Sequence, residues 1–490
     1  MLEGGDAAAV TWSSSDPGVA TVDANGNVAP VAAGTAVISA FSGDGYGLAE
    51  ATVTGAPADA VNPAPVPVPG TGTGNGTEQP GTETPSVEDG KVVAVVNVET
   101  DAAGKATAAL SEETVEAAIK ALESAEGGEL VIRVRAGETA RQVELTVPAA
   151  ALTAITGSSA GTVVFETDLG TISLDRDAFA AAAAEAGDDD LVVTIGTVAS
   201  GSSFGELTPA GRQIAETLIG NRSVVDLTLT VGGRTLSNLG GGTIGVGLPY
   251  SPGAGEDPNA IVALYLSEDG AVSIVRDGMY DASSGRLVFQ TEHLSRYAVG
   301  YNRLEFSDIG ASFAKDSVTY LAARDIIGGI GNGRFDPAGG LTRADVALLL
   351  ARLAGADTEQ TAGASFTDVK AGDYFAGAVA WASQNGIASG FGDGRFDPKA
   401  GVTREQLAAM LVRFAGYMNW TLPDNGAAAD FADADAIAAF ASEAAQAMSR
   451  AGIISGKPIA GRPGAYFAPQ DTATRAEAAH MLAKLLKSKQ

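Results

Sequence analysis

The chain has 490 residues, a length that predicts several domains rather than one hydrophobic core. It has no cysteine, which excludes disulfides, thiolate nucleophiles and cysteine-ligated metals. The net charge of −28 is concentrated in residues 1–302, which carry 39 acidic and 13 basic side chains, whereas residues 303–490 carry 20 and 18. An acidic surface is repelled by phosphate backbones, so nucleic acid is not expected as a partner; the near-neutral last third suits an anionic polymer better.

No apolar run is long enough to span a bilayer. The first six residues lack the basic start and the apolar stretch of a signal peptide. We therefore expect either that export is signalled otherwise or that the chain is a piece of a longer protein.

Residues 1–54 are predicted to form a small β-sandwich, because strand-like runs at 9–12, 19–22 and 36–40 are separated by turn residues. Three segments closely resemble group 2 bacterial Ig-like domains: Val10-Thr11-Trp12-Ser13-Ser14-Ser15-Asp16, Val19-Ala20-Thr21-Val22-Asp23 and Ala33-Gly34-Thr35-Ala36. That family has further strands before the tryptophan, so we expect this sandwich to be truncated.

Residues 55–90 are rich in Pro, Gly and Thr and are predicted to be a linker, because such a stretch cannot bury a core. Residues 91–302 are predicted to be a β-rich α+β stalk of unknown function. A helix is expected at 112–122, and a strand followed by a short helix at both 143–152 and 170–179. Further strands are expected at 92–98, 129–134, 225–231, 243–248, 261–266, 272–275 and 286–290, with a closing strand at 291–299.

The last part of the chain repeats one pattern three times, at residues 303–361, 362–424 and 425–490. Each copy has a Phe-x-Asp motif, a first helix followed by a glycine, a Phe-x-Pro turn and a second helix that starts at Thr-Arg. The corresponding residues are Asp308, Asp368 and Asp433; Gly329, Gly390 and Gly456; and Arg343, Arg404 and Arg475.

Each second helix has apolar residues at +3, +6, +7 and +10 from its arginine, which is one helical face. Three equivalent faces can be buried against one another. We therefore predict an all-α, pseudo-threefold bundle in which Leu350, Leu411 and Leu482 share one core.

These motifs closely resemble the S-layer homology family over the whole last third of the chain. The resemblance implies a three-pronged spindle around a central helix bundle. It also implies grooves between neighbouring modules that bind secondary cell-wall polysaccharide, often pyruvylated, in Gram-positive bacteria. The implied location is the extracellular cell wall or S-layer of a bacterium, without a cofactor, and self-association into a lattice is left open.

Two departures from the repeated pattern are visible. Repeat one has Asp325 where the others have Gly386 and Gly452, so the end of its first helix is expected to be strained. Repeat three inserts six residues between its Phe-x-Asp and Thr-Arg motifs and lacks the Asp-Gly-Arg-Phe turn of repeat two. The resemblance therefore gives the weakest support for the groove that uses this loop.

The threonines of the Thr-Arg motifs are explained as helix N-caps. An arginine at the start of a helix is mildly unfavourable, by about 0.3–1 kcal/mol, so its threefold use asks for a reason. Free N–H groups and a planar guanidinium suit a carboxylate. We therefore favour polysaccharide contacts for Arg343, Arg404 and Arg475 over a structural salt bridge to the Phe-x-Asp carboxylate. The two roles are compatible if the aspartate orients the arginine. On this reading, Arg404→Ala weakens binding and leaves the fold nearly intact.

The remaining candidate residues have two interpretations each. Asp308, Asp368 and Asp433 either contact the polysaccharide or form turns by accepting backbone N–H groups. Trp381 either stacks on sugar or packs in the core. Gly329, Gly390 and Gly456 are the last candidates for polysaccharide contacts.

The chain is predicted to anchor a non-enzymatic surface protein. Its two histidines, His293 and His480, have no evident catalytic partner, and no motif predicts a metal site. Two alternatives are left open: an anchored extracellular hydrolase that uses paired carboxylates in residues 91–302, and an adhesin.

Overall fold

The computed structural model describes residues 11–14, 20–22, 28–30, 34–42, 45–53 and 83–489, except 126, 237–238, 360–365 and 460–461. The chain divides into two compact units, residues 1–77 and 78–490. Most of the predicted linker lies outside the described residues. Within the described part, no helix is long and apolar enough to cross a membrane.

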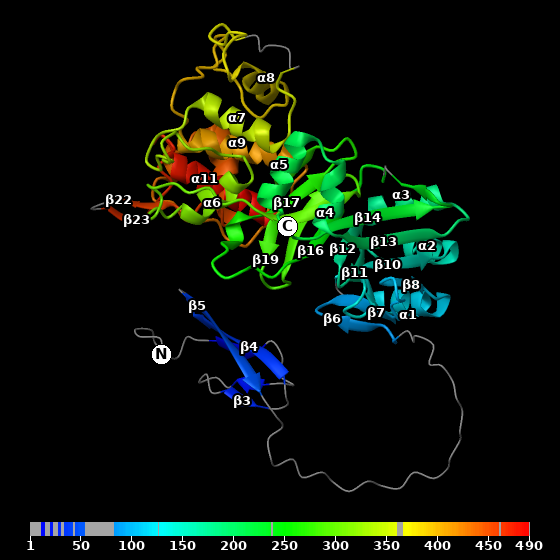
Figure 1. The fold of residues 1–490 in the computed structure, drawn as a ribbon. Helices are drawn as coiled ribbons and strands as arrows, with labels where there is room; N and C mark the ends of the chain where they lie inside the picture. The colour runs from blue at the N-terminus through cyan, green and yellow to red at the C-terminus, as the bar shows by residue number, and fades with distance from the viewer. Residues whose placement is uncertain are drawn as a thin grey trace, which may run out of the picture. The chain divides into compact units, whose positions relative to one another are not determined.

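The first unit is built from short antiparallel strands (Figure 1). β4 (Gly34–Ser42) pairs with both β1 (Thr11–Ser14) and β5 (Gly45–Val53). β2 (Ala20–Val22) and β3 (Val28–Pro30) form a separate pair. The β-rich character predicted for this region is confirmed.

Residues 86–301 form two eight-stranded sheets. The strands of the first are β8 (Lys105–Ala109), β10 (Gln142–Val147), β13 (Leu191–Val198), β14 (Val224–Val231), β15 (Arg234–Thr235), β17 (Ile261–Leu266), β18 (Val272–Val275) and β21 (Arg296–Tyr301). Those of the second are β6 (Ser86–Glu88), β7 (Lys91–Asn97), β9 (Glu129–Arg135), β11 (Thr162–Thr167), β12 (Gly170–Asp175), β16 (Ile244–Pro249), β19 (Met279–Asp281) and β20 (Arg286–Thr291). The strand orders are β18-β17-β21-β14-β13-β10-β8, with β15 beside β14, and β19-β20-β16-β12-β11-β9-β7-β6.

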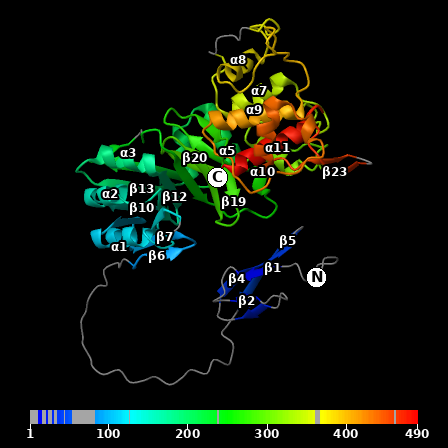
Figure 2. The same cartoon turned by 180° about the vertical axis from the view of Figure 1, so that it is seen from behind.

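The two sheets share one hydrophobic core. Alternate residues of β10, such as Val143 and Leu145, are buried together with Phe165 and Ile172 of the other sheet, as period-2 patterning requires. Three helices add to this core and lie side by side (Figure 2): α1 (Glu112–Leu122), α2 (Ala149–Thr156) and α3 (Arg176–Ala186). The remaining elements are α4 (Ser200–Ser203), η2 (Phe204–Glu206), α5 (Pro209–Leu218) and η3 (Pro258–Ala260).

Most strands and helices predicted for this region are confirmed within a residue or two, but the closing strand expected at 291–299 is β21 at 296–301. The strands β8, β11, β13 and β19 and the helix α5 were not predicted. A further difference lies at the start of the region, where β6 falls in the range assigned to the linker and pairs with β7.

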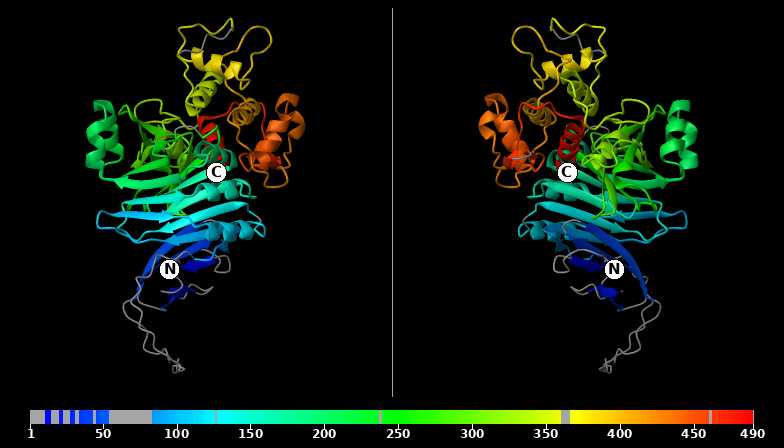
Figure 3. Two further views of the ribbon diagram at one scale, coloured as in Figure 1. Left: turned by 90° about the vertical axis from the view of Figure 1, so that its right-hand side faces the viewer. Right: turned by 90° about the vertical axis from the view of Figure 1, so that its left-hand side faces the viewer.

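The helices of residues 315–489 are grouped together in Figure 3. Each repeat supplies a first and a second helix: α6 (Lys315–Ala323) and α7 (Arg343–Leu353), α8 (Ala376–Gln384) and α9 (Arg404–Tyr417), and α10 (Ala439–Arg450) and α11 (Arg475–Ser488). A short helix, η4 (Ala434–Ala436), and a hairpin of β22 (Lys457–Ile459) and β23 (Arg462–Tyr466) belong to repeat three. The prediction that Leu350, Leu411 and Leu482 are buried in one core is confirmed.

The first helix of every repeat ends in the same hydrogen-bonded turn. In repeat one, the N–H of Asp325 donates to Ala322 O and the N–H of Ile326 to Leu321 O. This pattern requires a residue with positive φ after the helix. Gly386 and Gly452 adopt it at φ of 67° and 69°, and Asp325 adopts it at φ of 55°. The strain expected at Asp325 therefore comes from the positive φ of a residue that has a Cβ.

Replacing Asp325 with glycine is expected to stabilise the protein by up to about 1 kcal/mol. The left-handed conformation is costly for a residue with a Cβ, and this gain exceeds the extra entropy that glycine has in the unfolded chain. Asp325 is exposed, so removing its side chain gives up few contacts. Urea unfolding measures the change, with Asp316→Gly in the first turn of α6 as a control that should destabilise. A lower unfolding free energy for Asp325→Gly would contradict the assignment.

Buried polar contacts join repeat one to the two-sheet region. Arg324 is fully buried, and its guanidinium donates to the carbonyl oxygens of Gly278, Asn259 and Ile261 at 2.7, 3.0 and 2.8 Å. At the end of the chain, Lys489 forms a 2.8 Å ion pair with Asp277. The two-sheet region and the repeats are therefore joined by hydrogen bonds and an ion pair that are shielded from water.

Candidate functional site

The three Thr-Arg helices begin with identical capping boxes. The threonine hydroxyl accepts from the backbone N–H of the third helical residue, and the side chain of that residue accepts from the threonine N–H. The third residue is Asp345 in repeat one, Gln406 in repeat two and Glu477 in repeat three. The predicted role of the threonines as N-caps is confirmed.

Each arginine that follows reaches into the next repeat. Arg343 Nε donates to Phe396 O at 2.9 Å, Arg404 Nε to Phe467 O at 2.7 Å, and Arg475 Nε to Phe335 O at 2.8 Å. The acceptors belong to the Phe-x-Pro turns of repeats two, three and one, so the contacts run around a closed ring. This ring supports a cyclic arrangement of the repeats.

Two of the three arginines are buried, and Arg475 is partly buried. Arg343 and Arg404 are 6% and 4% exposed. Burial lowers the pKa of Arg343, and it also lowers the pKa of Arg475, while neighbouring aspartates oppose both changes. Arg404 additionally donates from Nη1 to Glu477 Oε1 at 2.7 Å. These side chains are part of the packing between repeats, a role that sequence analysis did not assign to them.

The Phe-x-Asp carboxylates do not pair with these arginines, in contrast to the salt bridge considered from sequence. Both oxygens of each carboxylate instead accept backbone N–H groups of the Phe-x-Pro turn. Asp368 accepts from Phe396 and Asp397 at 2.9 and 2.8 Å. Asp308 and Asp433 make the same pair of contacts. The turn interpretation of the aspartates is therefore confirmed.

The aspartates orient the arginines indirectly, since each holds the turn whose carbonyl receives a guanidinium. Hydrogen bonds from the turn N–H groups lower the pKa of Asp308. For Asp368, burial raises the pKa but the N–H groups of Phe396 and Asp397 outweigh it, and the net shift is downward. Stabilised carboxylates of this kind keep the turns formed at neutral pH.

The glycines after the first helices are explained by close packing. A Cβ on Gly390 would lie 2.6 Å from Arg395 O and 2.7 Å from the ring of Phe366, and Gly329 is enclosed in the same way. Gly456 has a φ of 76°, which favours glycine. Gly390 and Gly456 also line the two grooves described below.

Trp381 does not occupy a sugar-stacking position. It is 6% exposed and its ring packs edge-on against Phe414 and Tyr417. The inclusion of Trp381 among the polysaccharide-binding residues is therefore corrected: a large indole on the inner face of α8 fills the core.

Exposed aromatic residues stand elsewhere in the repeats. Phe313, Tyr374 and Phe440 are 68%, 73% and 52% exposed. They precede Tyr320, Trp381 and Ala447 by the same seven residues, so they occupy equivalent positions before or at the start of the first helices. This shared offset was visible in the sequence and could have identified them.

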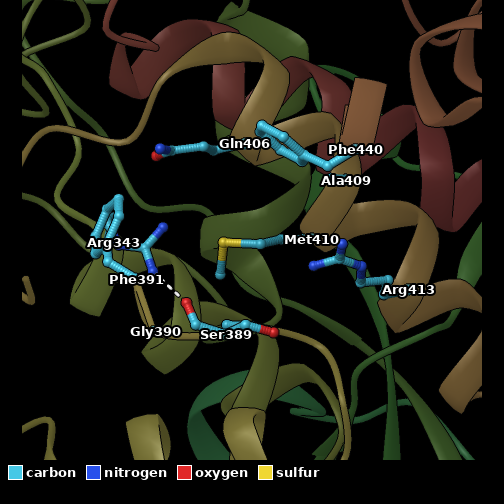
Figure 4. A pocket seen from close by; sticks show the side chains of 10 residues that line it. Arg343, Ser389, Gly390, Phe391, Gln406, Ala409, Met410, Arg413 and Phe440 are labelled. Carbon is cyan, nitrogen blue, oxygen red and sulfur yellow. Dashed lines mark hydrogen bonds between the residues drawn. The ribbon is translucent and has the colours of Figure 1, made fainter. Parts of the chain in front are cut away.

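Two grooves at equivalent places in the repeats each bring together a Thr-Arg arginine, a glycine and an exposed aromatic residue. The first groove, of about 280 Å³, is lined by Arg343 of repeat one, Phe440 of repeat three and, from repeat two, Ala388, Ser389, Gly390, Phe391, Gln406, Ala409, Met410 and Arg413 (Figure 4). The second groove, of about 330 Å³, is lined by Arg404 of repeat two, Phe313 of repeat one and, from repeat three, Ile453, Ile454, Ser455, Gly456, Lys457, Pro458, Glu477, His480 and Met481. Each groove therefore needs three repeats.

The inserted loop of repeat three contributes to the second groove. Lys457 lies in the β22–β23 hairpin, which stands where repeat two has a short turn. His480 lines this groove as well, with Nδ1 3.2 Å from Ser317 Oγ and its ring edge-on to Phe313. Among the described residues, no group of three or more His, Asp or Glu side chains is placed to hold a metal ion.

Comparison with known families agrees with this architecture. The S-layer homology domain matches residues 305–347, 365–408 and 430–479, and the bacterial Ig-like domain (group 2) matches residues 3–53. The chain is therefore a protein that carries three C-terminal S-layer homology domains. At its other end it carries a group 2 bacterial Ig-like domain.

Three relatives show the range of proteins that share sequence with this chain. The amylopullulanase of Thermoanaerobacterium thermosulfurigenes is 32% identical over 47% of this chain and 12% of the relative. The S-layer protein sap of Bacillus anthracis is 29% identical over 36% and 21%. The surface layer protein of Brevibacillus choshinensis is 39% identical over 21% and 9%. The chain thus covers less than a quarter of each relative's length.

Proposed function

We propose that the three C-terminal domains anchor this chain non-covalently to secondary cell-wall polysaccharide, and thereby hold a bacterial surface or S-layer protein at the cell wall. The observation that carries the proposal is the pair of equivalent grooves, each assembled from all three repeats. Each groove has a guanidinium, a glycine-bordered wall and an exposed aromatic ring. Polar donors beside an aromatic surface suit a sugar, which has hydroxyl groups at its edge and apolar faces.

The division of charge supports the same arrangement. Residues 1–302 carry almost all of the net negative charge, and residues 303–490 are close to neutral. An anionic wall polymer would repel the first part and tolerate the second. The acidic region is then displayed outward from the wall, with residues 303–361, 362–424 and 425–490 as the three anchoring modules.

The cargo of such an anchor can be structural or enzymatic. Relatives that share sequence with this chain include proteins named as S-layer proteins and others named as an amylopullulanase and an endoglucanase. We propose the structural alternative for this chain, because sequence analysis found no catalytic constellation in residues 91–302.

Binding of the whole chain to purified cell walls tests the anchor. We expect the protein to sediment with walls that retain their secondary polysaccharide and to stay in solution with walls from which that polysaccharide has been stripped. The triple variant Phe313→Ala, Tyr374→Ala and Phe440→Ala should lose at least tenfold in affinity, because each aromatic side chain is more than half exposed and borders a repeat interface.

The matched control is Ile214→Ala, an exposed apolar residue of α5 in the two-sheet region. It should bind like the wild type, and all variants should unfold at similar urea concentrations. Equal binding to stripped and unstripped walls would refute the anchor, since the polysaccharide would then not be the ligand.

A further inference from the structure

The end of α11 brings two lysines against the two-sheet region, and the two are bound there in different ways. Lys489 forms its 2.8 Å ion pair with Asp277. Lys487 is partly buried, and among the described residues no carboxylate forms an ion pair with it. Its Nζ instead lies 3.0 Å from Oδ1 of Asn259, which belongs to η3 of the two-sheet region. A lysine amine therefore faces the carbonyl group of a side-chain amide.

The Asn259 amide is held in place from its other end. Its Nδ2 donates to Asp257 Oδ1 at 3.1 Å, and this contact fixes which end of the amide faces Lys487. The backbone N–H of Asn259 donates to the same carboxylate oxygen at 2.9 Å. Its backbone carbonyl accepts from Arg324 Nη1 at 3.0 Å. A lysine, an asparagine and an aspartate are thus joined in sequence through the two ends of one amide group.

The surroundings favour the neutral form of the lysine, which is the form that acts as a nucleophile. Nζ of Lys487 lies 4.7 Å from the centroid of the ring of Tyr320, a buried residue. Burial and the nearby charge of Arg324 lower the pKa of Lys487, although Asp316 and Asp257 oppose this change. The neutral amine is therefore more populated than in an exposed lysine.

We propose that Lys487 and Asn259 form an intramolecular amide bond, with Asp257 as the catalytic carboxyl group. Nζ attacks Cγ of Asn259, the Cγ–Nδ2 bond breaks and the nitrogen leaves as ammonia. One proton passes from Nζ to the leaving nitrogen, and Asp257 relays it because it contacts Nδ2. No group is oxidised or reduced, and no further reactant is consumed. The reaction occurs once per chain, so it is compatible with a non-enzymatic surface protein.

This bond closes the three repeats into a covalent ring. Asn259 lies beside the entry to repeat one, because the N–H of Asn302 donates to the O of the neighbouring Ala260 at 2.9 Å. Lys487 lies at the end of repeat three, 228 residues after Asn259. A cross-link that closes so long a loop restricts the unfolded chain strongly. A pull on the displayed region then acts on both ends of the ring at once. The inference is independent of what the grooves bind.

Intact-mass spectrometry of the purified full chain, measured in denaturant, tests the bond. We expect the wild type to be lighter than its sequence by one molecule of ammonia. Lys487→Arg keeps the charge but cannot form the bond, so it should have the full mass of its sequence. Asp257→Asn keeps a hydrogen-bond acceptor but removes the carboxyl group, so it should lose ammonia at least tenfold more slowly. Trypsin should release from the wild type one branched peptide that contains both Asn259 and Lys487.

Lys489→Arg is the matched control, because Lys489 also contacts the two-sheet region but is paired with a carboxylate. It should lose one ammonia, as the wild type does, and both should unfold at a higher urea concentration than Lys487→Arg. A wild type with the full mass of its sequence would overturn the proposal. An ammonia loss that persists in Lys487→Arg would also overturn it, because the loss would then come from cyclisation of an asparagine elsewhere. The branched peptide decides the question even if Lys487→Arg folds poorly.

Discussion

Replacing Arg324 with leucine is expected to lower the free energy of unfolding by about 3–5 kcal/mol, because three carbonyl groups of the two-sheet region lose a charged donor. The guanidinium also donates to Tyr320 O at 2.9 Å and lies 3.7 Å from the centroid of the Tyr320 ring. Arg324 is completely buried, so water cannot replace these contacts. Urea unfolding followed by circular dichroism measures the loss.

Arg352→Leu is the matched control, since this arginine is exposed on α7. Its effect should stay within about 0.5 kcal/mol. If Arg324→Leu lowered the free energy of unfolding no more than the control does, the Arg324 contacts would not stabilise the two-sheet region and the repeats against each other. The same contacts mean that a fragment cut at residue 303 would expose Arg324 and remove its acceptors. Binding experiments should therefore use the full chain.

Arg404→Ala is expected to cost about 3–5 kcal/mol of stability, the range seen when one partner of a buried ion pair is removed. Arg404 is 4% exposed, and Glu477 is 14% exposed. Truncation leaves the Glu477 carboxylate with Lys457 at 3.6 Å as its nearest cation and leaves Phe467 O without its donor. The sequence alone predicted that this substitution would leave the fold nearly intact, and the burial of Arg404 reverses that expectation.

The double variant Arg404→Ala and Glu477→Gln separates the charge effect from packing. It should be more stable than Arg404→Ala alone, because the partly buried carboxylate that has lost its arginine is replaced by a neutral amide. Thermal and urea unfolding measure both variants. A single variant that unfolds like the wild type but no longer binds cell walls would return Arg404 to a direct role in binding.

The sequence by itself determined the parts of this protein that depend on local chemistry. Threonine caps, glycines with positive φ and a 3.6-residue apolar period act within a few residues of one another. Their threefold repetition predicted the helices, the shared core of Leu350, Leu411 and Leu482, and the family. The alternating strands of residues 91–302 were predictable for the same reason.

Only the tertiary structure decided what the charged residues do. Arg475 bonds to a carbonyl 140 residues earlier, and Arg324 to one 46 residues earlier, and no local pattern specifies such partners. Trp381 and Phe440 are both aromatic, yet the packing of the first helices buries one and exposes the other. A side chain at a repeat interface takes its role from the neighbouring repeat. The charge of each groove therefore follows from which residues the closed ring brings together.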